Sequence, residues 1–226
     1  MKLNHISEHV WVSSYDDDLG RPALGLIVAG DHSIAIDAGY SKTHVSDFYD
    51  AIKKENLPLP QYTILTHWHW DHSFAVHAIH GSCIAERRTY QILKNISKDD
   101  AYLNTLHKEN EHFQNEYKDS PVIITLPTIT FDDALDLNLS DLHIHAMHVT
   151  SPHTDDCTCI YVEEDKVLFV GDCICGVYPT WEVDIDKNNI LIDTLKNIDF
   201  DIAIGGHWDP YTKEKLLDDL KQLRIK

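Results

Sequence analysis

Four side chains of metal-ligand type lie within six residues, in the order His67, His69, Asp71 and His72. They follow the apolar segment 62–66, which we expect to be a buried strand. Residues two apart in an extended chain face the same way, so His67 and His69 can reach one metal ion. A turn after His69 then directs Asp71 and His72 toward a neighbouring position. The alternative is a solvated loop in which Asp71 caps the following helix.

Three further candidate ligands each lie at the end of an expected strand or just beyond it, namely His153, Asp172 and His207. Four ligands so close in sequence cannot surround two ions, so residues from elsewhere are needed. Taken singly, His153 would be a surface loop residue, Asp172 a residue that forms a turn and His207 a capping residue. Loops at strand ends are where α/β proteins build their sites. Their common placement therefore predicts that they meet the His-Asp cluster.

The elements that must position these residues alternate between strands and helices. Apolar runs and turn signals predict strands at 24–28, 33–37, 62–66, 83–85, several short runs within 121–149, and at 157–162, 167–172 and 201–205. Helical spacing is expected around 45–52, in a polar insertion at about 86–118, and at about 188–198 and 212–224. Two successive strand–helix halves predict two sheets with helices outside, a four-layer α/β architecture. We expect one domain over residues 1–226, because no linker rich in Pro, Gly or Ser divides the chain.

The charge and the composition exclude several classes of partner. Nineteen Lys and Arg residues against 37 Asp and Glu residues give a net charge of −18, which disfavours nucleic acid. No apolar run is long enough to span a membrane, and the first residues lack the apolar core of a secretory signal. The five cysteines fit reduced thiols better than a disulfide scaffold. We therefore expect a cytoplasmic protein with a small-molecule substrate; a homodimer stays open.

Five segments together resemble the metallo-β-lactamase superfamily, and the resemblance covers nearly the whole chain. In order they read SIAIDAG, THWHWDH, SPHTDD, VLFVGD and GGH. The resemblance implies the metallo-β-lactamase fold, an αββα sandwich with the metal site at one edge between the sheets. Asp at position 172 resembles the broad hydrolase branch and differs from the β-lactamases that use a Cys ligand there. His at position 69, rather than Glu, departs from the diiron flavoprotein branch.

By position in these segments, the resemblance assigns the ligands of two metal ions. The first ion would be held by His67, His69 and His153. The second would be held by Asp71, His72 and His207, with Asp172 bridging both ions. Asp37, in SIAIDAG, would orient the site from behind the ligands.

The ligand set indicates the cofactor and the reaction. We expect two divalent cations, with zinc favoured, although imidazole-rich sites also accept iron, manganese or nickel. Two ions about 3.5 to 4 Å apart share a water and lower its pKa to about 7, which supplies a bridging hydroxide as nucleophile. Asp71 is the catalytic candidate, because it could hold that nucleophile and move its proton. The expected reaction is hydrolysis of a small ester, lactone or thioester.

Other functions stay open. A phosphodiester or a β-lactam fits the same chemistry. A mononuclear iron dioxygenase acting on a persulfide uses the same scaffold and would hold one iron. A non-enzymatic metal-binding module would have no open coordination position. The thioesterases that act on glutathione thioesters carry an added C-terminal helical domain, which we do not expect here because residues 208–226 are too few to form it.

The surroundings of the predicted site are less informative. Arg87 and Arg88 begin the insertion and could reach an anionic substrate, but a solvated helix face is the simpler interpretation. Aromatic residues near the ligands could wall a substrate pocket, although core packing is the simpler interpretation of each: Trp68, Trp70, Trp181, Trp208, Tyr178 and Tyr211. Four cysteines on one expected hairpin suggest a structural metal site, but small apolar packing explains them more simply: Cys157, Cys159, Cys173 and Cys175.

Overall fold

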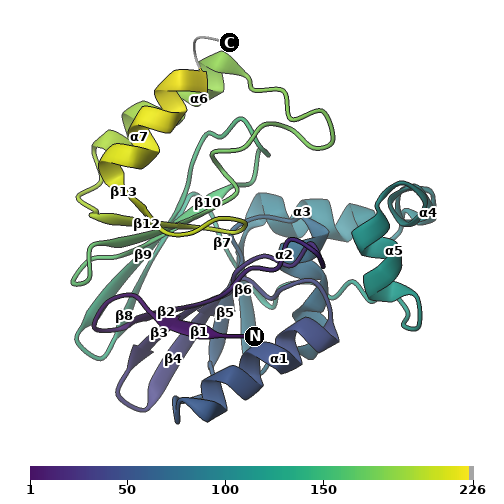
Figure 1. Cartoon of the computed structure of the whole chain (residues 1–226), viewed down its shortest axis with the longest axis horizontal. Coiled ribbons are helices and arrows are strands. Elements are labelled where there is room, and N and C mark those ends of the chain that lie inside the picture. The colour runs from purple at the N-terminus through teal and green to yellow at the C-terminus, as the bar shows by residue number, and fades with distance from the viewer. Residues whose placement is uncertain (224–226) are drawn as a thin grey trace.

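The computed structural model describes residues 1–223, which form two β-sheets packed face to face with helices on the outer sides (Figure 1). This arrangement confirms the four-layer αββα prediction. The expected hairpin of the first half forms as β3 (Gly25–Ala29) and β4 (His32–Ile36). Its turn contains Gly30 at a φ of 60°, a conformation that glycine adopts without steric cost.

The first sheet has seven strands in sequence order. They are β1 (Leu3–His5), β2 (Val10–Ser13), β3, β4, β5 (Tyr62–Ile64), β6 (Ser82–Glu86) and β7 (Ile129–Phe131). Strands β1 to β4 pair antiparallel, whereas β4 to β7 pair parallel. The carboxyl ends of β4 and β5 therefore lie at the same edge of the sheet.

The second sheet has six strands in the order β13-β12-β11-β10-β9-β8. They are β8 (Ala134–Leu139), β9 (Leu142–His148), β10 (Thr158–Val162), β11 (Val167–Gly171), β12 (Ile202–Gly205) and β13 (Tyr211–Thr212). Strands β11 and β12 pair parallel, and the other neighbours pair antiparallel. The loops after β11 and β12 consequently start from one edge, as the loops after β4 and β5 do in the first sheet.

The main core lies between the two sheets. Ile27 and Ile36 of the first sheet are buried with Ile144 and Phe169 of the second in one apolar cluster. The spacing between the sheets is tight at Gly25, where a Cβ atom would lie 2.4 Å from Phe169 Cε1. Burial of this apolar area, rather than helix or strand propensity, holds the two halves together.

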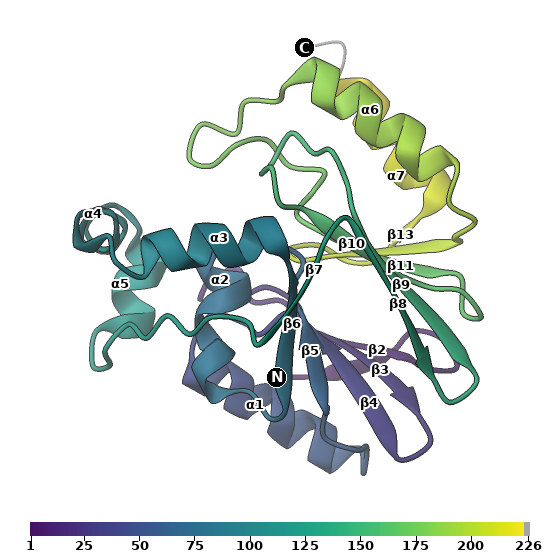
Figure 2. The ribbon, with the colours of Figure 1, turned by 180° about the vertical axis from the view of Figure 1, so that it is seen from behind.

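Helices cover the outer face of each sheet (Figure 2). Helix α1 (Lys42–Lys54) begins at Ser41, whose side chain accepts a hydrogen bond from the His44 amide, and it buries Phe48 against the first sheet. Helices α6 (Ile185–Lys196) and α7 (Lys213–Gln222) bury Leu191 and Leu216 against the second sheet. Both faces of the sandwich are thus shielded from water.

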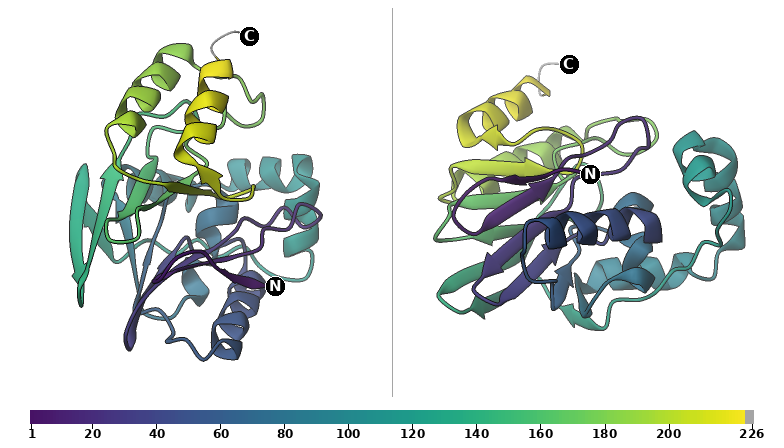
Figure 3. Two further views of the ribbon diagram at one scale, coloured as in Figure 1. Left: turned by 60° about the vertical axis from the view of Figure 1, so that its left-hand side comes forward. Right: turned by 60° about the horizontal axis from the view of Figure 1, so that its bottom comes forward.

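The polar segment expected to be a helical insertion forms three helices, α3 (Arg87–Ile96), α4 (Asp100–Glu109) and α5 (Glu111–Tyr117). Helices α4 and α5 stand away from the sheets at one end of the molecule (Figure 3). Their inner side packs on α2 (Trp70–Ser73) and the 3₁₀ turn η1 (Phe74–Ala78) through Leu106 and Phe113. The insertion therefore lies next to the predicted ligand cluster.

Two of the sequence expectations differ from the structure. Within 121–149 the strands cover only 129–148, and residues 121–128 form none. Pro121 and Pro127 flank that stretch, and proline lacks the amide that a ladder needs. The helix expected at 212–224 is α7, which ends at Gln222; residue 224 lies outside the described part. Within residues 1–223 no helix is both long and apolar enough to cross a membrane.

Candidate metal centre

Three predicted ligands form a first group at the edge between the sheets, namely His67, His69 and His153. Their ligand nitrogens all lie within 4.8 Å of one another. The Nδ1 atom of His69 is 3.1 Å from Nε2 of His67 and 2.9 Å from Nε2 of His153. The exposed fractions of these residues are 0%, 7% and 3%, so they are not the solvated loop histidines of the alternative interpretation.

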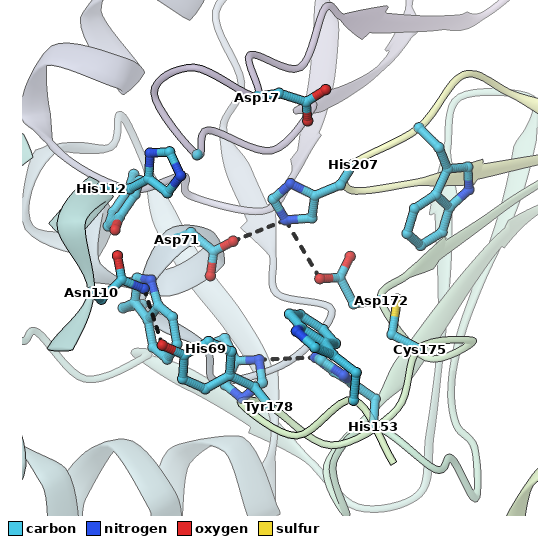
Figure 4. Close-up of a pocket in the computed structure, with 15 residues that line it drawn as sticks. Asp17, His69, Asp71, Asn110, His112, His153, Asp172, Cys175, Tyr178 and His207 are labelled. Atoms are coloured by element: carbon cyan, nitrogen blue, oxygen red, sulfur yellow. Dashed lines mark hydrogen bonds and ion pairs between the residues drawn. The ribbon is translucent and has the colours of Figure 1, made fainter. Parts of the chain in front are cut away.

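The other four predicted ligands form a second group beside the first, with ligand atoms within 4.8 Å of one another: Asp71, His72, Asp172 and His207. The Nε2 atom of His207 is 3.0 Å from Asp71 Oδ2 and 3.5 Å from Asp172 Oδ2. The Nε2 atom of His72 is 3.4 Å from the same Asp172 oxygen. Figure 4 shows His207 between the two carboxylates. The bridging role expected of Asp172 stays a prediction.

Both groups draw residues from the two halves of the sandwich. The residues from 67 to 72 follow β5 of the first sheet, whereas His153, Asp172 and His207 follow β9, β11 and β12 of the second. Beside the site the halves are joined directly, because the Thr158 amide donates to the Thr66 carbonyl at 2.7 Å. Each group is therefore assembled across the interface between the sheets.

Gly206 allows the second group to close. A Cβ atom at Gly206 would lie 2.5 Å from Asp172 Oδ1 and 2.7 Å from His72 Cε1. Real Cβ atoms do not approach side-chain atoms so closely, so a larger residue would push the ligands apart. Gly171, directly before Asp172, has a φ of 50°, and a Cβ atom there would lie 2.7 Å from the Thr66 side chain.

Hydrogen bonds from behind fix the ring orientation of three imidazoles. The Nδ1–H of His153 donates to the Gly176 carbonyl at 2.8 Å, because a carbonyl can only accept. The Nδ1–H of His72 donates to Asp37 Oδ2 at 2.7 Å. Thr66 Oγ1 donates to Asp37 and accepts from Nδ1–H of His67. Each ring thus directs Nε2 toward the site, as metal-binding histidines do.

The two groups differ electrostatically. Burial and neighbouring imidazoles lower the pKa of His69 to about 3 and the pKa of His67 well below its usual value. Burial alone would lower the pKa of His72 too, but Asp172 and Asp71 raise it well above the usual value. Burial alone would raise the pKa of Asp172, but His72 and His207 hold it well below its usual range. The first group is neutral imidazole and Asp172 is an ionised carboxylate, which are the protonation states that bind metal, whereas His72 is held protonated by the carboxylates beside it and would release its proton when an ion binds.

The residues present fit divalent metal ions. His72 Nε2 and Asp172 Oδ1 are buried without a hydrogen-bond partner in residues 1–223, and such groups are costly unless something pairs with them. In the first group the three imidazoles face one another with acceptor nitrogens, which cannot all be satisfied by hydrogen bonds. Imidazole with carboxylate is a ligand set for zinc and for other first-row transition metals.

A cavity of about 410 Å³ opens directly onto both groups. Four of the six aromatic residues expected near the site line it, namely Trp70, Tyr178, Trp181 and Trp208. The other two do not: Trp68 packs on Tyr102, and Tyr211 stacks on Trp208. The aromatic wall predicted from the sequence is therefore present in part.

The basic residues and most cysteines of the sequence analysis do not belong to the cavity. Arg87 pairs with Asp132 at 2.5 Å, and Arg88 pairs with Glu86 at 2.6 Å, away from the ligands. Three cysteines are packed in the core beneath α6, namely Cys157, Cys159 and Cys173. Within the described residues the five cysteines form no group of three or more ligands. Cys175 alone among them lines the cavity.

The residues that complete the cavity could not be identified from the sequence. Asp17 and Gly20 come from the turn before β3, Tyr40 from the loop after β4, Asn110 caps the N-terminus of α5, and His112 lies in α5. The run of three aspartates at 16–18 carried no signal that distinguished it from a solvated loop. Long-range folding, rather than local pattern, brings these residues to the site.

The chain is similar in sequence to a known protein family and to a curated protein. The family described as the Metallo-beta-lactamase superfamily matches residues 19–212. The chain is 24% identical over 186 residues to the Beta-lactamase-like protein 2 homolog of Caenorhabditis elegans, which covers 80% of this chain and 54% of that protein. The chain therefore spans about half the length of this curated relative.

Solved structures share the fold. A metallo-beta-lactamase from Pontibacter korlensis superposes with a TM-score of 0.74 at 18% identity, covering 100% of this chain and 99% of the other. The DIM-1 metallo-beta-lactamase superposes with a TM-score of 0.70 at 19% identity, covering 100% and 98%. The family match extends from the turn before β3 to the end of β13 and includes both ligand groups. The chain belongs to the metallo-beta-lactamase superfamily.

Proposed function

We propose that this protein is a metal-dependent hydrolase that holds two divalent ions, with zinc favoured, and cleaves a small ester, lactone or thioester. The family, the three-histidine group and the His/Asp group support a function of the metallo-hydrolase type. The observation that carries the proposal is the pair of adjacent groups, with three and four ligand residues, opening onto one cavity. A site for a single structural ion needs neither the second group nor the cavity.

When bound, the ions would act as Lewis acids and lower the pKa of a coordinated water. The chain's own residues orient the reactants. Burial alone would raise the pKa of Asp71, but His72 and His207 hold it below its usual value, so its carboxylate is ionised at neutral pH. Asp71 lines the cavity, and we expect it to accept the proton of an attacking water. We also expect the protein to act in the cytoplasm.

The test is metal loading followed by turnover. The protein is stripped with a chelator, reloaded separately with zinc, manganese or iron, and analysed for ions per chain. Each form is then assayed on a panel containing an ester, a lactone, a thioester, a β-lactam and a phosphodiester. The proposal expects two ions per chain and turnover of at least one acyl substrate.

Matched variants keep the test specific. Asp71→Asn should retain the fold and lose most of the turnover, whereas Asp31→Asn, an exposed carboxylate in the β3–β4 turn, should behave as the parent. One iron per chain with oxygen uptake would point instead to the dioxygenase chemistry. Two bound ions with no turnover of any substrate in the panel would contradict the proposal and favour a metal-binding module.

A further inference from the structure

The cavity over the metal-ligand groups contains no Lys or Arg among its fifteen lining residues. Besides the predicted ligands, the lining is mostly aromatic or uncharged, with one further carboxylate, Asp17, and one further histidine, His112. Proteins that recognise carboxylate or phosphate on a substrate generally use Arg or Lys for it. This cavity has no such group for a substrate anion away from the reacting carbonyl.

The nearest basic residue in sequence is held by other partners. Arg21 follows Gly20 of the lining, but its guanidinium lies 2.8 Å from Glu116 Oε1 and 3.0 Å from Asp47 Oδ2. Its Nε also donates to Glu116, so the pairing is bidentate. The Glu116 side chain is 5% exposed. Moving Arg21 from this bidentate pair to a substrate would leave a buried charge unpaired, which costs free energy. Arg21 therefore does not serve the cavity.

Asp17 lies at the rim with its charge available. It is in the turn 16–21, which is closed by the pairing of Asp16 with Arg21. Gly20 packs so closely on His112 of α5 that a Cβ atom there would lie 2.8 Å from the ring. The turn is thus fixed against the insertion. Figure 4 shows Asp17 beyond His207, across the cavity from Tyr178 and His153.

Trp181 presents a large aromatic face at the mouth of the cavity. It is 56% exposed and has a φ of 58°, a conformation that is rare for a bulky residue. Its ring stacks at 6.4 Å on His153 and lies 5.7 Å from Tyr178. Aromatic faces attract cations as well as apolar groups.

We propose that this cavity selects substrates with no anionic group near the scissile bond, and that Asp17 makes it prefer a cationic alcohol or acyl group over a neutral one. The proposal rests on the hydrolase function and names its substrate class. Trp181 supplies the surface on which that group lies, and Asp17 supplies the charge. Both are specificity residues that leave the reacting atoms untouched.

The test compares three acetate esters of similar size, those of choline, 3,3-dimethylbutanol and 3-hydroxypropanoate. The first two differ only in a quaternary nitrogen replaced by carbon, so their comparison isolates charge. One charge at about 7 Å in a water-like dielectric changes binding about threefold. We expect kcat/KM to fall about threefold from the cationic to the neutral ester and again to the anionic one, and the differences to shrink at high salt.

Variants at the rim assign the effect. Asp17→Asn should remove most of the preference, and Asp17→Lys should reverse it. Asp18→Asn, the same charge change one residue farther along outside the lining, should keep the preference. Trp181→Ala should raise KM for both bulky esters, and Trp181→Leu should restore part of the neutral ester's affinity only.

Binding measurements separate this proposal from the hydrolase function. Calorimetry with choline and with 3,3-dimethylbutanol reports charge preference without turnover. One outcome is that no ester is cleaved, that choline binds more tightly than 3,3-dimethylbutanol, and that Asp17→Asn removes this difference. In that case the hydrolase function is wrong and the charge selectivity of the cavity is correct. If esters are cleaved with equal kcat/KM, or the anionic ester is preferred, the selectivity proposal is wrong.

Discussion

The carboxylate of Asp37 accepts a hydrogen bond from Nδ1 of His72 at 2.7 Å. The same carboxylate accepts from the hydroxyl of Thr66, which in turn accepts from His67. One buried side chain thereby orients a ligand of each group. Asp37 itself has a φ of 65°, which an aspartate or an asparagine tolerates better than most residues.

Asp37→Asn should weaken metal binding while keeping the backbone in place. The amide would present a donor to His72 Nδ1, so the ring would carry its proton on Nε2, the atom that faces the site. Loss of such a supporting partner typically costs 10- to 100-fold, roughly, in metal affinity. Competition with a coloured chelator measures the affinity. Unchanged affinity for both ions would show that Asp37 does not orient the ligands.

Asp172→Ala should release at least one ion per chain. Asp172 and Asp71 each lie within 3.5 Å of both His72 and His207, so the loss of Asp172 leaves the second group with one carboxylate. Elemental analysis after extensive dialysis counts the ions. Asp31→Ala, in an exposed turn, is the matched control. Retention of two ions at the parent's affinity would overturn the assignment of the second group.

Gly206→Ala should disturb the second group without removing a ligand. The new methyl group would meet Asp172 and His72 at less than 3 Å, as the Cβ distances of 2.5 Å and 2.7 Å show. We expect weaker binding of one ion and a stability loss of about 1 to 3 kcal/mol, as for overpacked sites. Calorimetry and thermal melts measure the two effects. Gly30→Ala is the comparison for ion binding: a Cβ atom there has open space, so it should cost stability through its φ of 60° while leaving both ions bound as in the parent.

Removing metal should lower thermal stability. Ions that bind only the folded state stabilise it by about 4 kcal/mol when free metal exceeds the dissociation constant 1,000-fold. For a chain of this size that corresponds to roughly 10 °C in Tm. A melt with and without chelator gives the shift. His153→Ala should respond much less to the chelator, and an equal response in that variant would assign the shift to another site.

Asp156 should make stability depend on pH between about 4 and 6. It is buried beside Thr89, which donates to it at 2.8 Å, and burial raises its pKa from the usual 3.8 to about 6. The folded state therefore binds the proton more tightly than the unfolded state. Its contribution is fully present below pH 3.8 and is lost as the pH rises through about 6. Asp156→Asn lacks this titration.

Urea unfolding at several pH values tests that prediction. Relative to the parent, Asp156→Asn should gain about 2 to 3 kcal/mol between pH 4 and pH 7. Asp165→Asn is a control of opposite sign. Burial alone would raise the pKa of Asp165, but Ser7 and His9 lower it. A flat difference between Asp156→Asn and the parent would contradict the prediction.

The fold could be predicted because its strands and helices carry clear periodic patterns. The apolar runs before and after the turn at Gly30 became β3 and β4, and the helical spacing of Phe48 and its neighbours became α1. Strands β1, β2 and β13 were not predicted. They are two to four residues long, too short for a period to show, and each forms by pairing with a strand next to it in the chain.

The candidate ligands could be predicted because they lie in the segments that follow strand ends, where local sequence and sheet topology agree. His67 and Asp172 both gave that signal. The rim could not be predicted, since Asp17 and His112 come to one cavity only through the packing of Gly20 on His112 of α5. No pattern within either segment reports that contact. The ligand roles themselves stay predictions until ions are counted.

Each ligand group combines residues before and after the segment 118–126, which joins α5 to the second half. A cut there would leave His67, His69, Asp71 and His72 on one piece and His153, Asp172 and His207 on the other. Neither fragment alone carries a complete coordination set, although both contribute a sheet to the shared core. Added metal would then hold the two fragments together through ligands from both. The association of the fragments would therefore depend on the metal ion and could be used to detect it.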